Sequence, residues 1–318
     1  MRHTRVPASV LLFTLLAWAA PATAEVTPTV VVASEYHDLT PAATADYLAW
    51  STEKPLKGDR YRQGLFVQPT GGEPYRVNPS GTWGYKPEIE GTLLAYTEAP
   101  YGVYDVTIRF YDLATDAFVD PPAGMDSKGT NEWWPSISGD LLLFLREDPE
   151  TSYEELVVLD LVTGESQVLA TSKGWRRFLL PGQIDGDLVV WSKQAIDKDW
   201  ITWLKADVYV HDLSTGVTTT LANPGPKFQF GPSVDAAGTI FYGRAGAVAG
   251  TVCGRNSRLM SAVPGEEPTV LVSFEPGQDF FGSYARDNAD GSTTVFFDPG
   301  TCTDSGGWTD ADIWSIEV

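Results

Sequence analysis

Residues 133–164, WWPSISGDLLLFLREDPETSYEELVVLDLVTG, decide the fold because they contain two successive hairpin patterns. The stretch opens on an apolar residue two positions before a proline, Trp133-Trp134-Pro135, and turns at Ser138-Gly139-Asp140 before the aromatic Phe144. A second alternating pattern turns at residues 160–164, where Asp accepts from turn amides and Gly supplies a positive φ. The stretch therefore predicts four short β-strands.

This pattern recurs at a spacing of 46 to 51 residues along the chain. The apolar-x-Pro anchors are Leu39-Thr40-Pro41, Tyr85-Lys86-Pro87, Trp133-Trp134-Pro135, Leu179-Leu180-Pro181 and Phe230-Gly231-Pro232, with Phe281-Gly282-Ser283 as a degenerate sixth. A mostly aromatic position follows nine or ten residues after each proline, at Trp50, Tyr96, Phe144, Trp191 and Tyr242. Six copies of four strands predict an all-β, six-bladed β-propeller of four-stranded blades.

The two ends of the chain are expected to share one blade. The sixth copy supplies three strands and stops after residues 313–316. The β-rich run 29–36 precedes the first anchor and has the right length for a strand. We therefore predict a ring closed by the N-terminal strand, which completes the last blade and removes an open sheet edge.

The outer hairpins carry a family resemblance. Tyr111-Asp112-Leu113-Ala114-Thr115 resembles the Tyr-Asp-Leu-x-Thr-Gly ending of outer strands in the TolB-like six-bladed propeller family. The resemblance covers residues 25–318 and implies the propeller fold. It leaves the function open, since the repeat occurs in transport accessory proteins, in peptidase propeller domains and in some lyases.

The first residues are typical of an export signal. Arg2 and Arg5 precede an apolar run, and Ala22-Thr23-Ala24 forms a small-x-small cleavage site before Glu25. The run is too short to span a bilayer, which argues against a membrane anchor. We therefore expect residues 1–24 to be a signal peptide, residues 25–318 to form the propeller, and the protein to be secreted or periplasmic.

Composition excludes several classes of partner. Acidic residues outnumber basic ones by 42 to 22, for a net charge of -20, which disfavours nucleic acid and anionic membranes. Two Cys and three His are too few for a structural metal cluster. We predict no cofactor, no metal site, no membrane insertion and a monomer.

Catalytic motifs are scarce. There is no Gly-x-Ser-x-Gly elbow, and His37 and His211 are the only candidate bases after the signal. We interpret His211 as a solvent-facing strand residue and His37 as a loop residue. Glu88, Asp185 and Asp235 are expected along the central channel, where such acids either hold a hard cation or form a hydrated polar lining.

Loop length points to one face of the ring. The links between the two hairpins of each blade look long. Together with the loops between blades they fall on one side of the ring, which we call the long-loop face. The hairpin turns lie on the opposite side, the short-turn face. The expected links are residues 51–63, 97–105, 146–154, 192–205, 243–256 and 298–309. Long loops on a rigid scaffold commonly bind ligands. We predict a ligand-binding patch of Trp175, Arg176, Arg177, Trp200 and Trp203.

Three functions remain open at this level. The first is an exported, non-enzymatic binding propeller that recognises a protein or surface glycan through the long-loop face. The second is a polysaccharide lyase or glycosidase that uses carboxylates at the channel mouth. The third is a structural accessory of an envelope complex.

A disulfide between Cys253 and Cys302 is the testable expectation from sequence. No third Cys competes, and both lie in the corresponding links of consecutive blades. The bridge closes a loop of 50 residues, which corresponds to about 4 kcal/mol in the chain-entropy model. Intact-mass analysis after alkylation under denaturing, non-reducing conditions should show no added alkyl group, whereas two added groups identify the alternative, a pair of free thiols.

Overall fold

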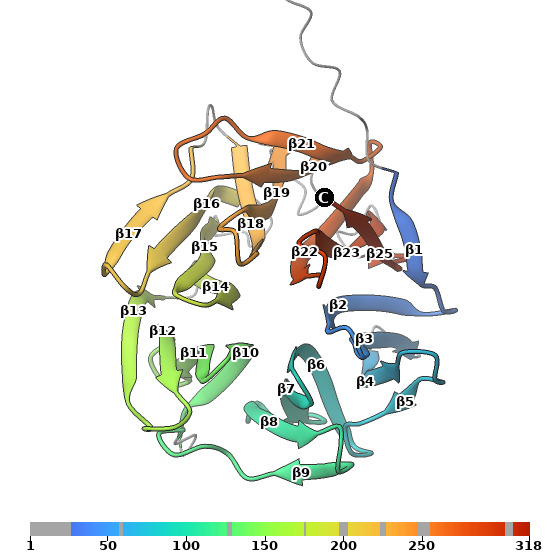
Figure 1. The fold of residues 1–318 in the computed structure, drawn as a ribbon. Coiled ribbons are helices and arrows are strands. Elements are labelled where there is room, and N and C mark those ends of the chain that lie inside the picture. The colour runs from blue at the N-terminus through green and yellow to red at the C-terminus, as the bar shows by residue number, and fades with distance from the viewer. Residues whose placement is uncertain are drawn as a thin grey trace, which may run out of the picture.

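A computed structural model describes residues 27–56, 60–125, 129–174, 176–196, 203–222, 227–246, 255–302 and 308–318. Within these residues six antiparallel sheets are arranged as blades around a central axis (Figure 1). The six-bladed β-propeller predicted from the repeats is confirmed. No helix in the described residues is long and apolar enough to cross a membrane.

The first three blades follow the chain order from the inner to the outer strand. Blade 1 contains β2 (His37–Ala43), β3 (Tyr47–Leu56), β4 (Arg60–Pro69) and β5 (Tyr75–Arg76). Blade 2 contains β6 (Thr82–Glu90), β7 (Leu93–Pro100), β8 (Thr107–Asp112) and β9 (Ala117–Val119). Blade 3 contains β10 (Asn131–Ser138), β11 (Leu141–Asp148), β12 (Tyr153–Asp160) and β13 (Ser166–Lys173).

The next two blades repeat this order, and the last one differs. Blade 4 contains β14 (Arg177–Asp185), β15 (Leu188–Ile196), β16 (Trp203–Asp212) and β17 (Val217–Thr220). Blade 5 contains β18 (Lys227–Val234), β19 (Ile240–Gly246), β20 (Arg255–Ala262) and β21 (Thr269–Ser273). Blade 6 contains β22 (Gln278–Asp287), β23 (Thr293–Cys302), β25 (Ile313–Glu317) and β1 (Thr29–Val32), with the short β24 (Trp308–Thr309) paired to β23.

The ring closes through both ends of the chain, as the sequence predicted. Strand β1 pairs antiparallel with β25, with Thr29 opposite Ser315 and Val30 opposite Trp314. Figure 1 shows this seam where the blue N-terminal strand lies beside the red C-terminal strands. Only residues 29–32 of the expected run 29–36 are strand.

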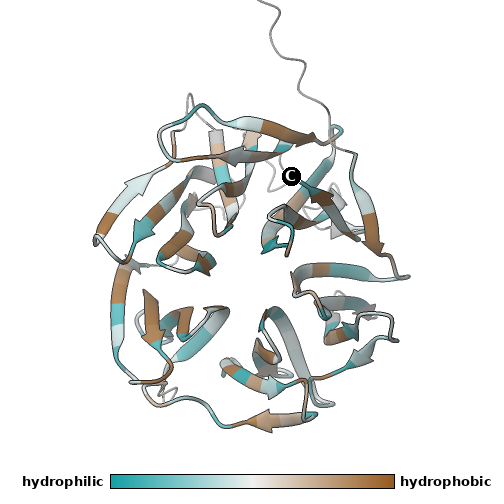
Figure 2. Ribbon diagram, in the orientation of Figure 1, coloured by the Kyte–Doolittle hydropathy of each residue, from teal (hydrophilic) through white to brown (hydrophobic). Residues whose placement is uncertain are grey.

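The hydrophobic core lies between neighbouring blades. Middle strands direct successive apolar side chains to alternate neighbours: Leu142 of β11 packs in a cluster with blade 2, and Leu143 packs in a cluster with blade 4. Figure 2 shows hydrophobic residues in brown along the strands. One cluster joins blades 2 and 3 through Phe110 and Phe144, and another joins blades 5 and 6 through Phe241 and Phe297. Trp191 packs likewise between blades 3 and 4 and Tyr242 between blades 4 and 5, so the repeated aromatic positions pack blade against blade.

A β-bulge at the apolar-x-Pro anchor is the repeated backbone feature of the inner strands. The pairing register shifts between Leu39 and Ala42 and between Tyr85 and Glu88, and at the equivalent residues of blades 3 and 5. In blade 4 the shift follows the anchor, between Pro181 and Ile184. The residues before proline at Thr40, Lys86 and Trp134 have φ of 52°, 52° and 54°, a left-handed conformation that non-glycine residues rarely adopt. A bulge redirects side chains and is common at barrel rims and next to functional sites.

Hydrogen bonds between blades hold these bulges. The backbone N–H of Lys86 donates to Ser51 Oγ of blade 1 over 3.3 Å, and that of Trp134 donates to Thr97 Oγ1 of blade 2 over 2.8 Å. At the seam the backbone N–H of Thr40 donates to Asp298 Oδ2 of blade 6 over 2.9 Å. Ser51 and Thr97 directly follow the repeated aromatic residues Trp50 and Tyr96, and Asp298 directly follows Phe297 of blade 6.

The structure corrects three details of the sequence analysis. The first detail is the sixth anchor, where Phe280 rather than Phe281 pairs with β23, opposite Pro299. The bulge of blade 6 therefore consists of residues 281–282. The second detail is the fourth anchor, where the register shift lies between Pro181 and Ile184 rather than at Leu180-Pro181. At the sixth anchor blades 5 and 6 approach closely, because a Cβ on Gly231 would lie 2.4 Å from Gly282 Cα. The third detail is His211, which is buried rather than solvent-facing, with Nδ1 2.8 Å from Thr218 Oγ1.

The links are also shorter than expected, because the strands continue into them. In blade 3 only residues 149–152 separate β11 from β12, where 146–154 was expected. The predicted signal peptide and Cys253 lie outside the described residues, and Cys302 is described only as part of β23.

Closure can be tested by removing the N-terminal strand. We expect deletion of residues 27–36 to unpair the outer edge of blade 6, lower the unfolding free energy by several kcal/mol and promote association. The control is Val30→Thr with Val31→Thr, because both side chains are exposed and the backbone pairing is retained. A deletion variant that stays monomeric with an unchanged melting temperature would contradict the closure.

Candidate functional site

Side chains that reach across the axis fill the middle of the central channel. Gln183 of blade 4 accepts from the backbone N–H groups of Val234 and Ala285, and its Nε2 donates to Ala285 O over 2.8 Å. Tyr284 of blade 6 donates its hydroxyl to Glu88 Oε1 of blade 2 over 3.0 Å. Burial raises the pKa of Glu88 well above its ordinary value. These contacts form an axial plug, so the two faces of the ring are separate surfaces.

The channel mouth on the long-loop face is a small polar hollow of about 70 Å³. The bulges turn Thr40, Lys86 and Trp134 toward it, and the Lys86 Nζ lies 5.7 Å from the centre of the Trp134 ring. Burial lowers the pKa of Lys86, and the negative charge of Asp298 opposes that effect. Asp298 Oδ1 also accepts from the backbone N–H groups of Phe281 and Gly282, so this carboxylate secures the seam of the ring.

A larger pocket of about 240 Å³ adjoins the channel mouth between blades 3 and 4 on the same face, and Trp134 lines both. Its walls combine aromatic and aliphatic side chains with two carboxylates. The lining residues are Tyr104, Trp133, Trp134, Leu145, Glu147, Ser152, Glu154, Gly174, Phe178, Leu179 and Leu180. We call it the blade 3 pocket.

Two glutamates face each other in this pocket. Glu147 in β11 and Glu154 in β12 are direct cross-strand partners, and like charges at such positions are destabilising. Glu147 is 7% exposed, and its Oε2 accepts from Tyr104 Oη over 2.9 Å and from Asn131 Nδ2 over 3.2 Å. Neither carboxylate forms an ion pair with a lysine or arginine in the part of the chain that the structure describes.

The environment favours the neutral form of one glutamate. Burial raises the pKa of Glu154 to about 7, and the negative charge of Glu147 adds to that effect. The backbone N–H of Leu179, which donates to Glu154 Oε2 over 2.8 Å, and the charge of Lys193 act in the opposite direction. At neutral pH this glutamate therefore changes its charge readily.

Two buried polar groups in the pocket have no hydrogen-bond partner among the described residues. They are Trp133 Nε1 and Ser152 Oγ. Ser152 is 6% exposed and has a φ of 52°, so its backbone is held in a strained conformation beside the pocket. Buried polar groups are normally paired, and both groups are free to meet a ligand.

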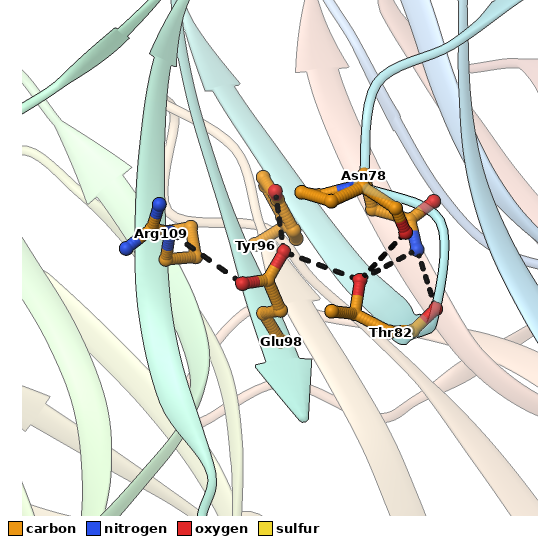
Figure 3. A network of polar contacts seen from close by, with 6 residues as sticks. Asn78, Thr82, Tyr96, Glu98 and Arg109 are labelled. Carbon is orange, nitrogen blue, oxygen red and sulfur yellow. Dashed lines mark hydrogen bonds and ion pairs between the residues drawn. The ribbon is translucent and has the colours of Figure 1, made fainter. Parts of the chain in front are cut away.

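The neighbouring blade supplies a structural network rather than a second site. Figure 3 shows Glu98 at its centre, where Oε2 accepts from Tyr96 Oη over 3.1 Å and Oε1 lies 3.6 Å from Arg109 Nε. Thr82 Oγ1 also reaches Glu98, and Asn78 Nδ2 donates to Thr82 O over 2.8 Å. This network ties the loop between blades 1 and 2 to β7, and its carboxylate is already paired with protein groups.

Acids also gather at the opposite, short-turn end of the channel. Burial raises the pKa of Asp185 to about 6, and the charge of Asp287 and a hydrogen bond with it add to this effect. Smaller contributions come from Asp235 and Glu90. Asp235 accepts from Thr239 N and Thr293 Oγ1. No group of three or more His, Cys, Asp or Glu among the described residues is arranged to hold a metal ion.

The predicted contact patch is only partly described. Arg176 and Arg177 are exposed at the start of β14, and Arg176 O accepts from Ile196 N over 3.0 Å. Trp203 begins β16, where its backbone pairs with Ile196. These three residues therefore share the long-loop end of blade 4, whereas Trp175, Trp200 and the side chain of Trp203 lie outside what is described. Their role in binding stays a prediction.

Sequence reasoning missed Glu147 and Glu154 because it placed residues 146–154 in a loop. The sequence does indicate the pairing: Glu147 and Glu154 are equally distant from the centre of the link at residues 150 and 151, so a tight hairpin places them opposite each other. Only the register decides that they share one face.

Comparisons with known proteins agree on the fold. No family model and no curated protein matches the sequence. Similar structures include TolB from Acinetobacter baumannii, at 15% identity over 90% of this chain and 65% of that chain with a TM-score of 0.54. The putative TolB from Agrobacterium tumefaciens is 12% identical over 90% of this chain and 91% of that chain, with a TM-score of 0.57. An oligogalacturonate lyase from Vibrio parahaemolyticus is 10% identical over 91% and 82%, with a TM-score of 0.50.

The TolB-like six-bladed propeller is thus confirmed as a fold. The chain spans about two thirds of the length of the Acinetobacter baumannii TolB. At these identities the similarity concerns the fold and leaves activity and partners to the site itself.

The paired glutamates should make stability depend on pH. Because the folded pKa of Glu154 is raised, the native state loses stability as pH rises from about 4.5 through 7. Glu154→Gln removes that loss, so we expect the variant to be more stable than the wild type by about 1 kcal/mol at pH 8 and equal to it near pH 4. Urea unfolding at the two pH values measures the difference.

A matched control separates this effect from net charge. Glu155 is the next residue of β12 and stands opposite Arg146 in the register. Glu155→Gln removes the same charge without relieving a like-charge pair, so it should bring no gain at pH 8. Equal gains in both variants would show that net charge, not the pair, is responsible.

Proposed function

We propose that this chain is an exported, non-enzymatic binding propeller, secreted or periplasmic, that recognises a protein or a surface glycan through its long-loop face. The observation that carries the proposal is the blade 3 pocket together with the channel mouth. Both open on that face and share Trp134, and the blade 3 pocket contains two buried polar groups without a hydrogen-bond partner among the described residues.

The rigidity of this surface supports binding. Three residues that line the channel mouth are held at positive φ by hydrogen bonds to neighbouring blades, so their side chains are fixed before a ligand arrives. Preorganised groups lose less entropy on binding. Aromatic side chains such as Trp134 and Tyr104 also supply large contact area, and Tyr104 is 59% exposed.

Charge favours a protein with basic groups over a neutral glycan. The chain carries a net charge of -20, and the pocket presents two carboxylates without a basic partner in the described residues. Complementary charge speeds association and selects partners. We also include in the contact surface the predicted patch of Trp175, Arg176, Arg177, Trp200 and Trp203, of which Arg176, Arg177 and the backbone of Trp203 lie at the long-loop end of the adjoining blade 4.

A second candidate, a glycosidase, has one observation in its favour. A glutamate with a pKa of about 7 beside another carboxylate fits an acid and nucleophile pair. Yet Glu147 is buried and engaged by Tyr104 and Asn131, and catalytic carboxyls must flank the scissile bond. The acids at the short-turn end fit less well, because Asp185 and Asp287 hydrogen-bond to each other and leave no room for a sugar between them. Binding is therefore the function that we propose.

Photo-crosslinking tests which face binds. Val103 on the long-loop face is 54% exposed, and Val162 in an outer turn on the short-turn face is 74% exposed. With a benzophenone amino acid at either position, produced in the exporting cells, we expect a discrete adduct from Val103 and none from Val162. Trp175→Ala with Trp203→Ala should lower the adduct yield more than twofold if the patch takes part.

The alternatives have distinct outcomes. Binding of the mature protein to a glycan array without an adduct from Val103 identifies a glycan ligand. Release of products from a panel of polysaccharides supports the glycosidase. Equal adducts from both faces, or no adduct and a blank array, contradict the proposal.

A further inference from the structure

The pair of Glu147 and Glu154 is specific to blade 3. At the corresponding positions in other blades, Glu53 stands opposite Gln63 and Gln194 stands opposite Ala206. The repeat therefore folds without two acids at these positions. In blade 3 the pair raises the energy of the native state, and the charge of Lys193 offsets this in part without forming an ion pair with either glutamate.

A third acceptor lies in the same pocket. Ser152 Oγ is buried, lines the pocket and has no hydrogen-bond partner among the described residues. Together with one oxygen from each glutamate it makes three acceptors. A primary ammonium group carries three N–H donors and no acceptor, so the numbers match.

The walls of the pocket also suit a cation. Trp133 packs against Tyr104 with ring centres 5.6 Å apart and against Trp134 at 6.4 Å. Aromatic rings attract ammonium groups and apolar stems of lysine side chains alike. Trp133 Nε1, which has no acceptor within the described chain, is a donor suited to a peptide carbonyl next to the ammonium group.

We propose that the blade 3 pocket binds a primary ammonium group of a partner protein, from a lysine side chain or a chain N-terminus, with Glu147, Glu154 and Ser152 as its acceptors. The inference rests on the proposed function and names the chemistry of the partner. The size of the pocket, about 240 Å³, is below that of typical ligand sites and accommodates a single side chain rather than an oligosaccharide. The negative charge of the whole chain attracts such a group from solution.

Small model compounds test the site on the intact mature protein. The probes are Nα-acetyl-lysine methylamide, glycine methylamide and Nα,Nε-diacetyl-lysine methylamide, titrated at pH 8 by calorimetry or tryptophan fluorescence. We expect the lysine or the glycine probe to bind with a Kd in the millimolar range and the diacetyl probe not to bind. The stronger of the two identifies a side chain or an N-terminus as the source.

Three variants locate the binding. Glu154→Gln should weaken the bound probe at least tenfold, and Glu155→Gln should change its affinity less than twofold. Glu154→Lys places an ammonium group opposite Glu147 within the chain, so it should raise the melting temperature and abolish probe binding together. The rise in stability shows that this variant is folded.

Several results would overturn the inference. They are no binding of either ammonium probe at 10-fold the expected Kd, equal binding by wild type and Glu154→Gln, or binding of the diacetyl probe. A crosslink from Val103 in a protein that binds no ammonium probe would reject the ammonium site and leave the binding function standing. Probe binding without any crosslink or glycan ligand would reject the proposed binding function and leave the ammonium site standing.

Discussion

A hydrogen bond from the backbone of one inner strand to a side chain of the preceding blade holds the ring together near its axis. It is seen at three junctions of the described chain, with Ser51, Thr97 and Asp298 as acceptors. Each donor belongs to a bulge at a pre-proline residue with a left-handed backbone, which costs energy that only the surrounding structure can offset. Asp298 accepts three backbone N–H groups at the seam, so the closure of blade 6 on blade 1 depends on a buried carboxylate as well as on strand pairing.

The same constraint shapes the surface that we propose for binding. A regular strand would alternate its side chains between the two neighbouring blades, whereas the bulge turns Lys86 and Trp134 into the channel mouth. Trp134 then forms a wall between this mouth and the blade 3 pocket. The strained anchors thus support the fold through their hydrogen bonds and the surface through their side chains.

The axial plug separates two electrostatic environments. On the short-turn side, Asp185 and Asp287 share a hydrogen bond, and Asp235 and Glu90 add further negative charge. On the long-loop side, Glu147 and Glu154 share a pocket with aromatic rings and with a buried hydroxyl that lacks a partner in the described chain. In the first arrangement two carboxyls hydrogen-bond to each other, whereas in the second neither glutamate forms an ion pair with a lysine or arginine of the described chain. This difference is why the long-loop face is the one assigned to binding.

The sequence by itself determined the architecture of this protein. Six copies of an anchor, a turn and an aromatic position specify six hairpin pairs, and a missing strand at one end matched by a spare run at the other specifies the closure. These features are local or periodic, so they can be read along the chain. The exact register of the sixth copy, the buried state of His211 and the pairing of Glu147 with Glu154 were decided only by the tertiary structure. Each depends on how far strands extend and on which blade lies next to them, and a shift of one residue would turn either glutamate to the other face of the sheet.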